Sequence, residues 1–178
     1  MPSPLHPALV HFPIVLILLG TLVALPAAVT PRWHLRWIAA ALLAIGALGA
    51  LIASATGEQD GEAIEHQPQV SALLDQHEEW AERTQGFSIG AGFLAAVAAA
   101  ATLRWPRAAR GLGLAGAAIA VIASICVFQT GHYGGQLVYR HGAGVNLAPA
   151  VSANATGQPA APSTKNARRS HGDDDDHR

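Results

Sequence analysis

The sequence predicts an all-α integral membrane four-helix bundle, and two observations carry that prediction. The chain of 178 residues is 51% hydrophobic and 13% charged, whereas soluble domains carry about 25% charged residues. Its apolar residues also concentrate in four runs, which short polar stretches separate. A helix needs about 20 apolar residues to cross roughly 30 Å of hydrocarbon. Runs of this length therefore predict four membrane-spanning helices.

The predicted spans cover residues 10–29, 37–55, 87–103 and 112–129, and the outer segment 57–86 is expected to be partly helical. Each run must be a helix because unpaired backbone groups are too costly in lipid. Small residues recur inside the last three runs: Gly46, Gly49, Ala50, Gly90, Gly92, Gly113, Gly116 and Ser124. Since small residues let helix backbones approach closely, we expect one bundle within a domain of residues 1–147.

The first run is predicted to remain as a membrane helix. A secretory signal carries positive charge before its apolar stretch, but residues 1–13 contain no lysine or arginine. At the other end, residues 148–178 are rich in Ala, Pro, Ser, Thr and Asn without apolar periodicity. Such composition cannot supply a packed core, so this tail is predicted to be disordered.

Charges beside the runs predict the orientation. The segments after the first and third runs contain arginines and no acid: Arg32, Arg36, Arg104, Arg107 and Arg110. Residues 57–86 instead contain eight acids against one base, Arg83. Because short cytoplasmic loops are enriched in Lys and Arg, the arginine segments are expected in the cytoplasm. Both termini then lie outside, which in a bacterium means a periplasmic position beside the inner membrane.

Several classes of site are excluded by composition. Cys126 is the single cysteine, so there is no internal disulfide, no multi-cysteine metal site and no Cys-x-x-Cys-His for covalent haem. The chain has no basic patch interleaved with aromatics, which gives no reason to propose nucleic acid as a partner. No Ser/His/Asp order or phosphate-binding Gly-rich loop indicates a conventional enzyme, so at most a redox role is expected.

Two short segments resemble each other. Residues 56–62 and 130–136, which follow the second and fourth runs, both read Thr-Gly-x-x-x-Gly followed by Glu or Gln. Their positions suggest two related helical hairpins. The glycines are explained equally by ordinary helix C-caps and by the close approach of another group to the backbone.

The histidines form the main functional pattern. With the predicted topology, six lie on the outer side: His6, His11, His66, His77, His132 and His141. His34 lies instead among the cytoplasmic arginines. Neutral imidazole is the commonest protein metal ligand and an axial ligand of b-type haem. The sequence therefore indicates a haem or metal site at the outer membrane face.

Among these histidines, His11 is the first choice. It lies about one helical turn above Ile14, where a polar side chain beside lipid is expensive unless it faces the bundle. Pro13 is expected to kink the helix there, and His6 is placed to fold over the same site. His77 lies on one face of a predicted helix at headgroup level or above, with Glu78 as a candidate to orient an imidazole.

These motifs resemble a known family. They are HPALVHFPIVL at residues 6–16, the Thr-Gly after the second run, His77-Glu78, and GGQLVYRHGAGV at residues 134–145. Together they resemble the bacterial integral-membrane family called domain of unknown function 2231, over about residues 4–145. The resemblance implies a four-helix membrane module, sometimes encoded with or fused to cytochrome c-like domains, and hence redox chemistry. It matches His6, His11, His77 and His141, whereas the family pattern asks for no histidine at His132.

Three functions remain open at this point. One is a membrane-anchored b-type haem protein that passes electrons at the outer face, with a c-type cytochrome or another periplasmic redox protein as partner. Another is a copper, zinc or iron site. The third is a structural or partner-docking membrane subunit without cofactor, with oligomerisation open. The cofactor candidates are His6, His11, His77 and His141, with His66, His132 and Glu78 as accessories.

Overall fold

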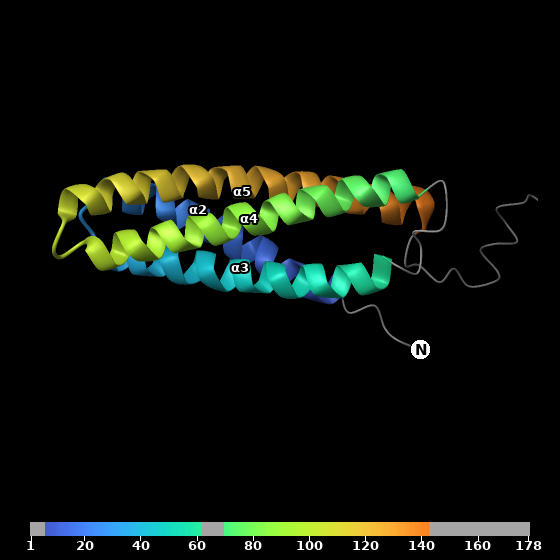
Figure 1. Ribbon diagram of the computed structural model, residues 1–178, viewed down its shortest axis with the longest axis horizontal. Coiled ribbons are helices and arrows are strands. Elements are labelled where there is room, and N and C mark those ends of the chain that lie inside the picture. The colour runs from blue at the N-terminus through green and yellow to red at the C-terminus, as the bar shows by residue number, and fades with distance from the viewer. Residues whose placement is uncertain (1–5, 62–69, 143–178) are drawn as a thin grey trace, which may run out of the picture. The chain divides into compact units, whose positions relative to one another are not determined.

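The computed structural model describes residues 6–61 and 70–142, which all belong to one compact unit. Five helices follow one another in the chain: α1 (His6–Leu9), α2 (His11–Val29), α3 (Trp33–Gly61), α4 (Ser71–Ala101) and α5 (Pro106–His141) (Figure 1). These two stretches contain no strand. The all-α prediction is confirmed, while the predicted disorder of residues 148–178 lies outside the described residues.

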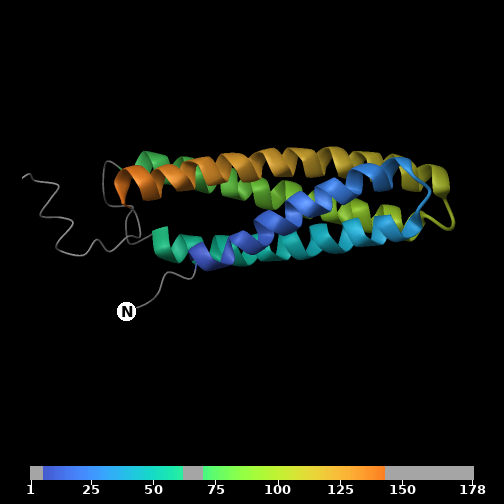
Figure 2. The ribbon, with the colours of Figure 1, turned by 180° about the vertical axis from the view of Figure 1, so that it is seen from behind.

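The four long helices form a closed bundle. Helix α2 packs on α3, α3 on α4, α4 on α5, and α5 again on α2, and Figure 2 shows α2 in blue lying between α3 and α5. All four are long and apolar enough to cross a membrane. Large apolar side chains such as Phe12, Phe93 and Phe128 point outward, as expected where lipid replaces water as the solvent.

The interior is built from small residues, as the sequence predicts. Its main cluster combines Leu43 with alanines from all four helices, among them Ala24, Ala91 and Ala120. A Cβ on Gly92 would lie 3.3 Å from the backbone nitrogen of Ala44. The helices α3 and α4 therefore approach so closely that a larger residue would force them apart.

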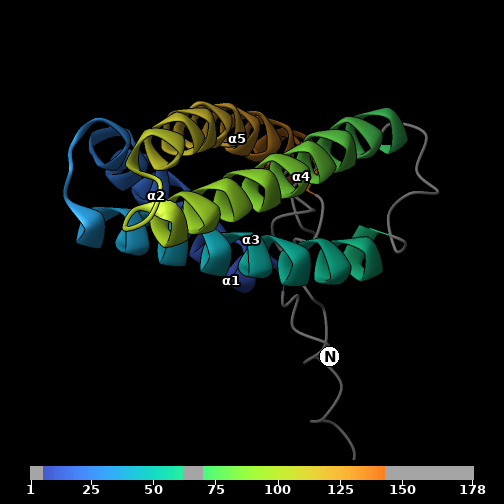
Figure 3. The same ribbon diagram turned by 60° about the vertical axis from the view of Figure 1, so that its left-hand side comes forward.

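A break near Pro13 separates α1 from α2. Proline has no backbone N–H and its ring clashes with the carbonyl four residues earlier, which here belongs to Leu9. Helix α1 ends at Leu9 and α2 begins at His11. The interruption falls at Val10, before His11 rather than below it as expected, and α1 packs against α3 (Figure 3).

Several helices extend well beyond the predicted spans. Helix α3 continues to Gly61 and α5 to His141, so Gly57 and Gly131 lie inside helices and their interpretation as C-caps is wrong. His132, which follows the fourth predicted span, likewise lies within α5 rather than after the end of that helix. Hydropathy marks the thickness of the hydrocarbon layer, whereas a helix can continue into the polar region beyond it. The left-handed cap of α5 is Gly142, at φ 65°.

The bundle has two chemically distinct ends. At one end, which we call the histidine end, lie α1, the end of α3, the start of α4 and the end of α5. The opposite end, the arginine end, holds the turns from α2 to α3 and from α4 to α5, with Arg32 and Arg104 (Figure 1). This separation agrees with the charge pattern of the sequence.

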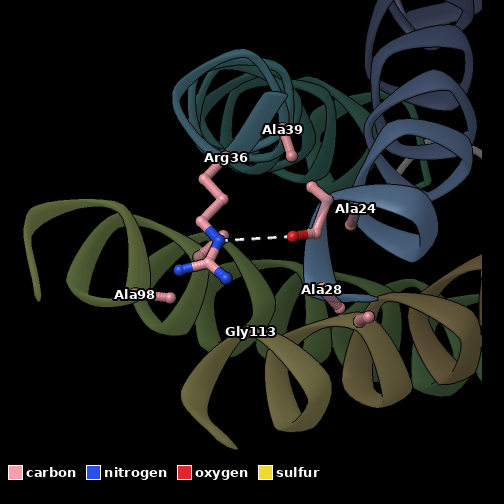
Figure 4. Close-up of a pocket in the computed structure, with 9 residues that line it drawn as sticks. Ala24, Ala28, Arg36, Ala39, Ala98 and Gly113 are labelled. Atoms are coloured by element: carbon pink, nitrogen blue, oxygen red, sulfur yellow. Dashed lines mark hydrogen bonds between the residues drawn. The ribbon is translucent and has the colours of Figure 1, made fainter. Parts of the chain in front are cut away.

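Arg36 departs from its predicted place in a loop. It lies in the first turn of α3 and is only 8% exposed. Its Nε donates to the carbonyl oxygen of Ala27 at 3.2 Å and its Nη1 to Oγ1 of Thr102 at 3.0 Å. Beside it lies a small cavity lined mainly by alanines from all four helices (Figure 4). The guanidinium thus joins the ends of α2 and α4 to α3.

Pro31 explains why Arg36 is needed. In a helix the carbonyl of Ala27 would accept from the N–H four residues later, but that residue is proline and has no N–H. Helix α2 therefore ends with an unpaired carbonyl in a buried place, and Arg36 supplies the missing donor. A cation at a helix C-terminus also interacts favourably with the helix dipole.

We predict that Arg36→Met lowers the stability of the bundle by about 1–3 kcal/mol, because it leaves a buried carbonyl without a donor. Methionine keeps an unbranched apolar stem of similar length. Thermal unfolding in mild detergent, followed by circular dichroism, measures the effect. Arg32→Met is the matched control, since Arg32 is exposed at the same end. Equal melting temperatures for the two variants would contradict this role.

Candidate functional site

His6 is held against α3 by a hydrogen bond and a glycine. Its Nδ1 lies 2.8 Å from the carbonyl oxygen of Ala53, with Oγ1 of Thr56 at 3.5 Å. The imidazole covers Gly57, where a Cβ would lie 2.9 Å from Cε1 and 3.0 Å from Nδ1 of the ring. Real Cβ atoms do not come so close, so this position of His6 depends on Gly57 lacking a side chain.

His77 is held against α5 in the same way. Its Nδ1 lies 3.0 Å from the carbonyl oxygen of Thr130. Its ring covers Gly134, where a Cβ would lie 3.1 Å from Cε1 and 3.2 Å from Nδ1. In both cases the accepting carbonyl stands four residues before the glycine, one helical turn away. We call this combination of a glycine and the carbonyl one turn earlier a glycine socket.

The two sockets bring the imidazoles together. The ring centroids of His6 and His77 lie 6.4 Å apart, and the ring planes are nearly perpendicular, at 88°. His6 comes from α1 and is anchored on α3, whereas His77 comes from α4 and is anchored on α5. Since α3 and α5 are not neighbours in the ring of helices, the pair links the two halves of the bundle at the histidine end.

The hydrogen bonds set the proton positions on both rings. A carbonyl oxygen only accepts, so Nδ1 carries the hydrogen in His6 and in His77, and Nε2 keeps its lone pair. Within residues 6–61 and 70–142, neither Nε2 takes part in a hydrogen bond. Metal-ligating histidines typically donate their other ring N–H to a carbonyl or carboxylate. Both rings thus have the tautomer that a metal ligand requires.

Burial favours the neutral form of His77. The residue lies in the early turns of α4, before the apolar run that starts at Phe87, and thus outside the hydrocarbon. Burial lowers the pKa of the His77 imidazole; the hydrogen bond to Thr130 raises it, and the neighbouring His6 lowers it. A lowered pKa reduces competition from protons for the Nε2 lone pair.

Hydroxyl groups fix the spacing of α4 and α5 beside His77. The Oγ1 atoms of Thr84 and Thr130 lie 3.2 Å apart. One of these hydroxyls donates to the other, and the second donates to the carbonyl one turn earlier in its own helix, that of Trp80 for Thr84 or of Cys126 for Thr130. The residue whose carbonyl holds His77 is therefore itself tied to α4, so the socket and the histidine keep a constant separation.

The structure does not bring the other candidates to this pair. His11 is exposed at the start of α2 and His141 is exposed in the last turn of α5. Among the described residues, no ring contact or hydrogen bond joins His141 to His6 or His77. The same residues contain no group of three or more His, Cys, Asp or Glu able to hold a metal ion. Ligand roles for His11 and His141 stay predictions.

Two of the three accessory candidates lie among the described residues. His132 is exposed on α5, and its Nε2 lies 2.8 Å from Nε2 of Gln136, which donates to it. Glu78 is exposed, with Oε1 3.4 Å from where a Cβ on Gly61 would lie. His66 falls outside the described residues.

Sequence reasoning missed the socket residues Ala53, Thr130 and Gly134. The repeated Thr-Gly motif indicates the correct pair of helices, but its register is wrong. The motif aligns Gly57 with Gly131, and a Cβ on Gly131 would meet nothing within 4 Å. The glycine that corresponds to Gly57 in space is Gly134, three residues later. Gly131 and Gly134 differ in which side of α5 they lie on, and only Gly134 faces the His77 ring. A seven-residue motif does not show which side of the helix faces a neighbour.

Residues 2–147 match the model of a family described as predicted membrane protein, DUF2231. The chain belongs to this family. The match covers the whole described bundle, including both histidines of the pair and both glycine sockets. It confirms the resemblance carried by the HPALVHFP and GGQLVYRHGAGV segments. No curated protein and no solved structure matches the chain, so the function of this DUF2231 protein must be argued from its own residues.

We predict that Gly57→Ala and Gly134→Ala each displace the neighbouring imidazole, because the new methyl group would occupy ring space. The displaced histidine should lose its Nδ1 hydrogen bond. Histidine ¹⁵N chemical shifts report this as a change from the Nδ1–H tautomer to a mixture. Gly131→Ala, in open space on the same helix as Gly134, is the control and should leave both tautomers unchanged. Unchanged spectra in all three variants would contradict the sockets.

Proposed function

We propose that this protein is a membrane-anchored electron-transfer protein that binds a b-type haem through His6 and His77. The pair of anchored imidazoles supports the proposal. Haem iron takes four nitrogens from the porphyrin, so a protein needs to supply only two axial ligands. His6 and His77 provide two imidazoles of the required tautomer, each from a different half of the bundle.

The number of ligands favours haem over a structural zinc ion. Zinc in proteins takes three or four protein ligands, whereas the described residues contain no cluster of that size. The separation of the rings fits a shared metal. The ring centroids lie 6.4 Å apart, so one bound group would be within reach of both imidazoles. Iron held in this way would supply one-electron redox chemistry.

The sockets would control how the imidazoles meet the iron. A carbonyl bonded to Nδ1–H makes the opposite nitrogen a stronger donor and fixes the plane of the ring. Both histidines have this arrangement, and the ring planes are perpendicular. The protein therefore would determine both the basicity and the relative orientation of the axial ligands, which are its means of tuning a redox potential.

The charge distribution supports an outward-facing histidine end. The described part of the arginine end holds Arg32, Arg104, Arg107 and Arg110, all exposed, and such residues favour the cytoplasmic side. In a bacterial inner membrane the histidine pair would then face the periplasm. Its electron donor or acceptor would be a periplasmic redox protein, such as a c-type cytochrome.

We predict that the full-length protein, purified in mild detergent and supplied with haemin, gives the sharp reduced-minus-oxidised bands of bis-imidazole haem. His6→Ala and His77→Ala should each abolish these bands, because iron would lose one axial ligand. His132→Ala is the matched control: this histidine is exposed at the same end on α5 and should not matter.

Other outcomes separate the alternatives. Loss of the bands in His11→Ala or His141→Ala, with His6→Ala and His77→Ala unaffected, would move the site to those residues. Stoichiometric copper, zinc or iron without haem bands, measured by elemental analysis on the same sample, would replace haem by a metal ion. Neither haem nor metal after reconstitution would leave a partner-docking membrane subunit.

A separate experiment tests which side of the membrane the histidine end faces. In a Cys126→Ala background, Gln76→Cys places a thiol at the histidine end and Ala108→Cys places one at the arginine end, both at exposed positions. A membrane-impermeant maleimide should label Gln76→Cys in spheroplasts and Ala108→Cys only after lysis. The reverse pattern would place the histidine pair in the cytoplasm and remove a periplasmic partner.

A further inference from the structure

The turn between α4 and α5 surrounds a hollow at the arginine end. Its lining is a continuous segment: Arg104, Trp105, Pro106, Arg107 and Ala108. The hollow opens widely to solvent. Pro106 produces the shape, because a residue before proline avoids helical geometry. Trp105 accordingly has φ −137° and ψ 69°, and the chain bends sharply there.

The arginines of this hollow have no acidic partner. Arg104 and Arg107 are exposed. Within the described stretches neither forms an ion pair, whereas Arg83 at the opposite end of the bundle pairs with Glu79. The whole segment from residue 101 to 116 contains no Asp or Glu. Two guanidinium groups without a counter-charge favour an anion, and their planar donor groups fit a phosphate in particular.

Apolar side chains adjoin the same arginines. Leu103 is 92% exposed and Trp105 is 64% exposed, although both follow directly on an apolar helix. Tryptophan is enriched at the boundary between hydrocarbon and headgroups. A ligand that matches this surface combines an anionic phosphate with a long apolar chain. Free phosphate satisfies only half of that description.

We propose that the hollow binds the phosphate of an anionic phospholipid, which Arg104 and Arg107 contact while its acyl chains lie beside Leu103 and Trp105. Basic pockets at membrane-helix ends recognise anionic lipid headgroups by the same charge complementarity. The site lies at the arginine end, far along α4 and α5 from the histidine pair, and is independent of haem binding. It would hold the α4–α5 turn at a constant depth in the membrane.

Native mass spectrometry of the full-length protein tests this site. The protein, delipidated in mild detergent, is titrated with phosphatidylglycerol or with phosphatidylcholine of the same acyl chains. The wild type should retain one phosphatidylglycerol in preference to phosphatidylcholine. In Arg104→Gln/Arg107→Gln we expect its apparent affinity to fall about thirtyfold, since each arginine near an anionic headgroup is worth roughly fivefold. Arg140→Gln, exposed at the other end, should leave it unchanged.

The remaining outcomes overturn the proposal. Equal retention of the two lipids, or an unchanged affinity in the double variant, would show that the arginines do not select an anionic lipid. Displacement of phosphatidylglycerol by inorganic phosphate at equal concentration would assign the hollow to a free phosphate instead. Because both substitutions are at exposed positions, the double variant should keep the wild-type helix content by circular dichroism, so its lipid affinity is compared with that of an equally folded wild type.

Discussion

The fold depends on one constraint: a backbone carbonyl inside a membrane-spanning bundle has no water to bond with, so the protein must supply a donor. Helical hydrogen bonds meet most of this need, and side chains meet the rest. Buried hydroxyls need a partner as well, and those of Thr21, Ser88 and Ser124 donate to the carbonyl one turn earlier in their own helix. Where Pro31 removes a donor, Arg36 replaces it. No buried side-chain nitrogen or oxygen among the described residues lacks a partner.

The histidine pair extends the same principle to a site. The carbonyls of Ala53 and Thr130 each accept from an imidazole, and a glycine one turn later leaves room for the ring. Close packing of alanine-rich helices then brings the two anchored rings together. Features that serve stability deeper in the bundle, namely small residues and side-chain donors to carbonyls, serve at the histidine end to orient two imidazoles.

The sequence predicts the bundle and the separation of its charged ends, because hydropathy and charge act over whole segments. The ligand roles of His6, His11, His77 and His141 stay predictions. Sequence reasoning ranked His11 above His6, since distance from the hydrocarbon was the available criterion. The structure lays α1 against α3, which brings the ring of His6 to that of His77. Arg36 was placed in a loop for a similar reason: its role depends on which carbonyl Pro31 leaves unpaired, and that is a property of three-dimensional packing.

The two histidines differ in how they are tethered. His77 is part of a helix of 31 residues, and moving it means moving much of the bundle. His6 belongs to a helix of four residues, too short to be stable alone, and attached to α2 through the break at Val10. Thermal motion will therefore act on the two rings unequally. The pair therefore joins one imidazole carried by a long helix to one carried by a single helical turn.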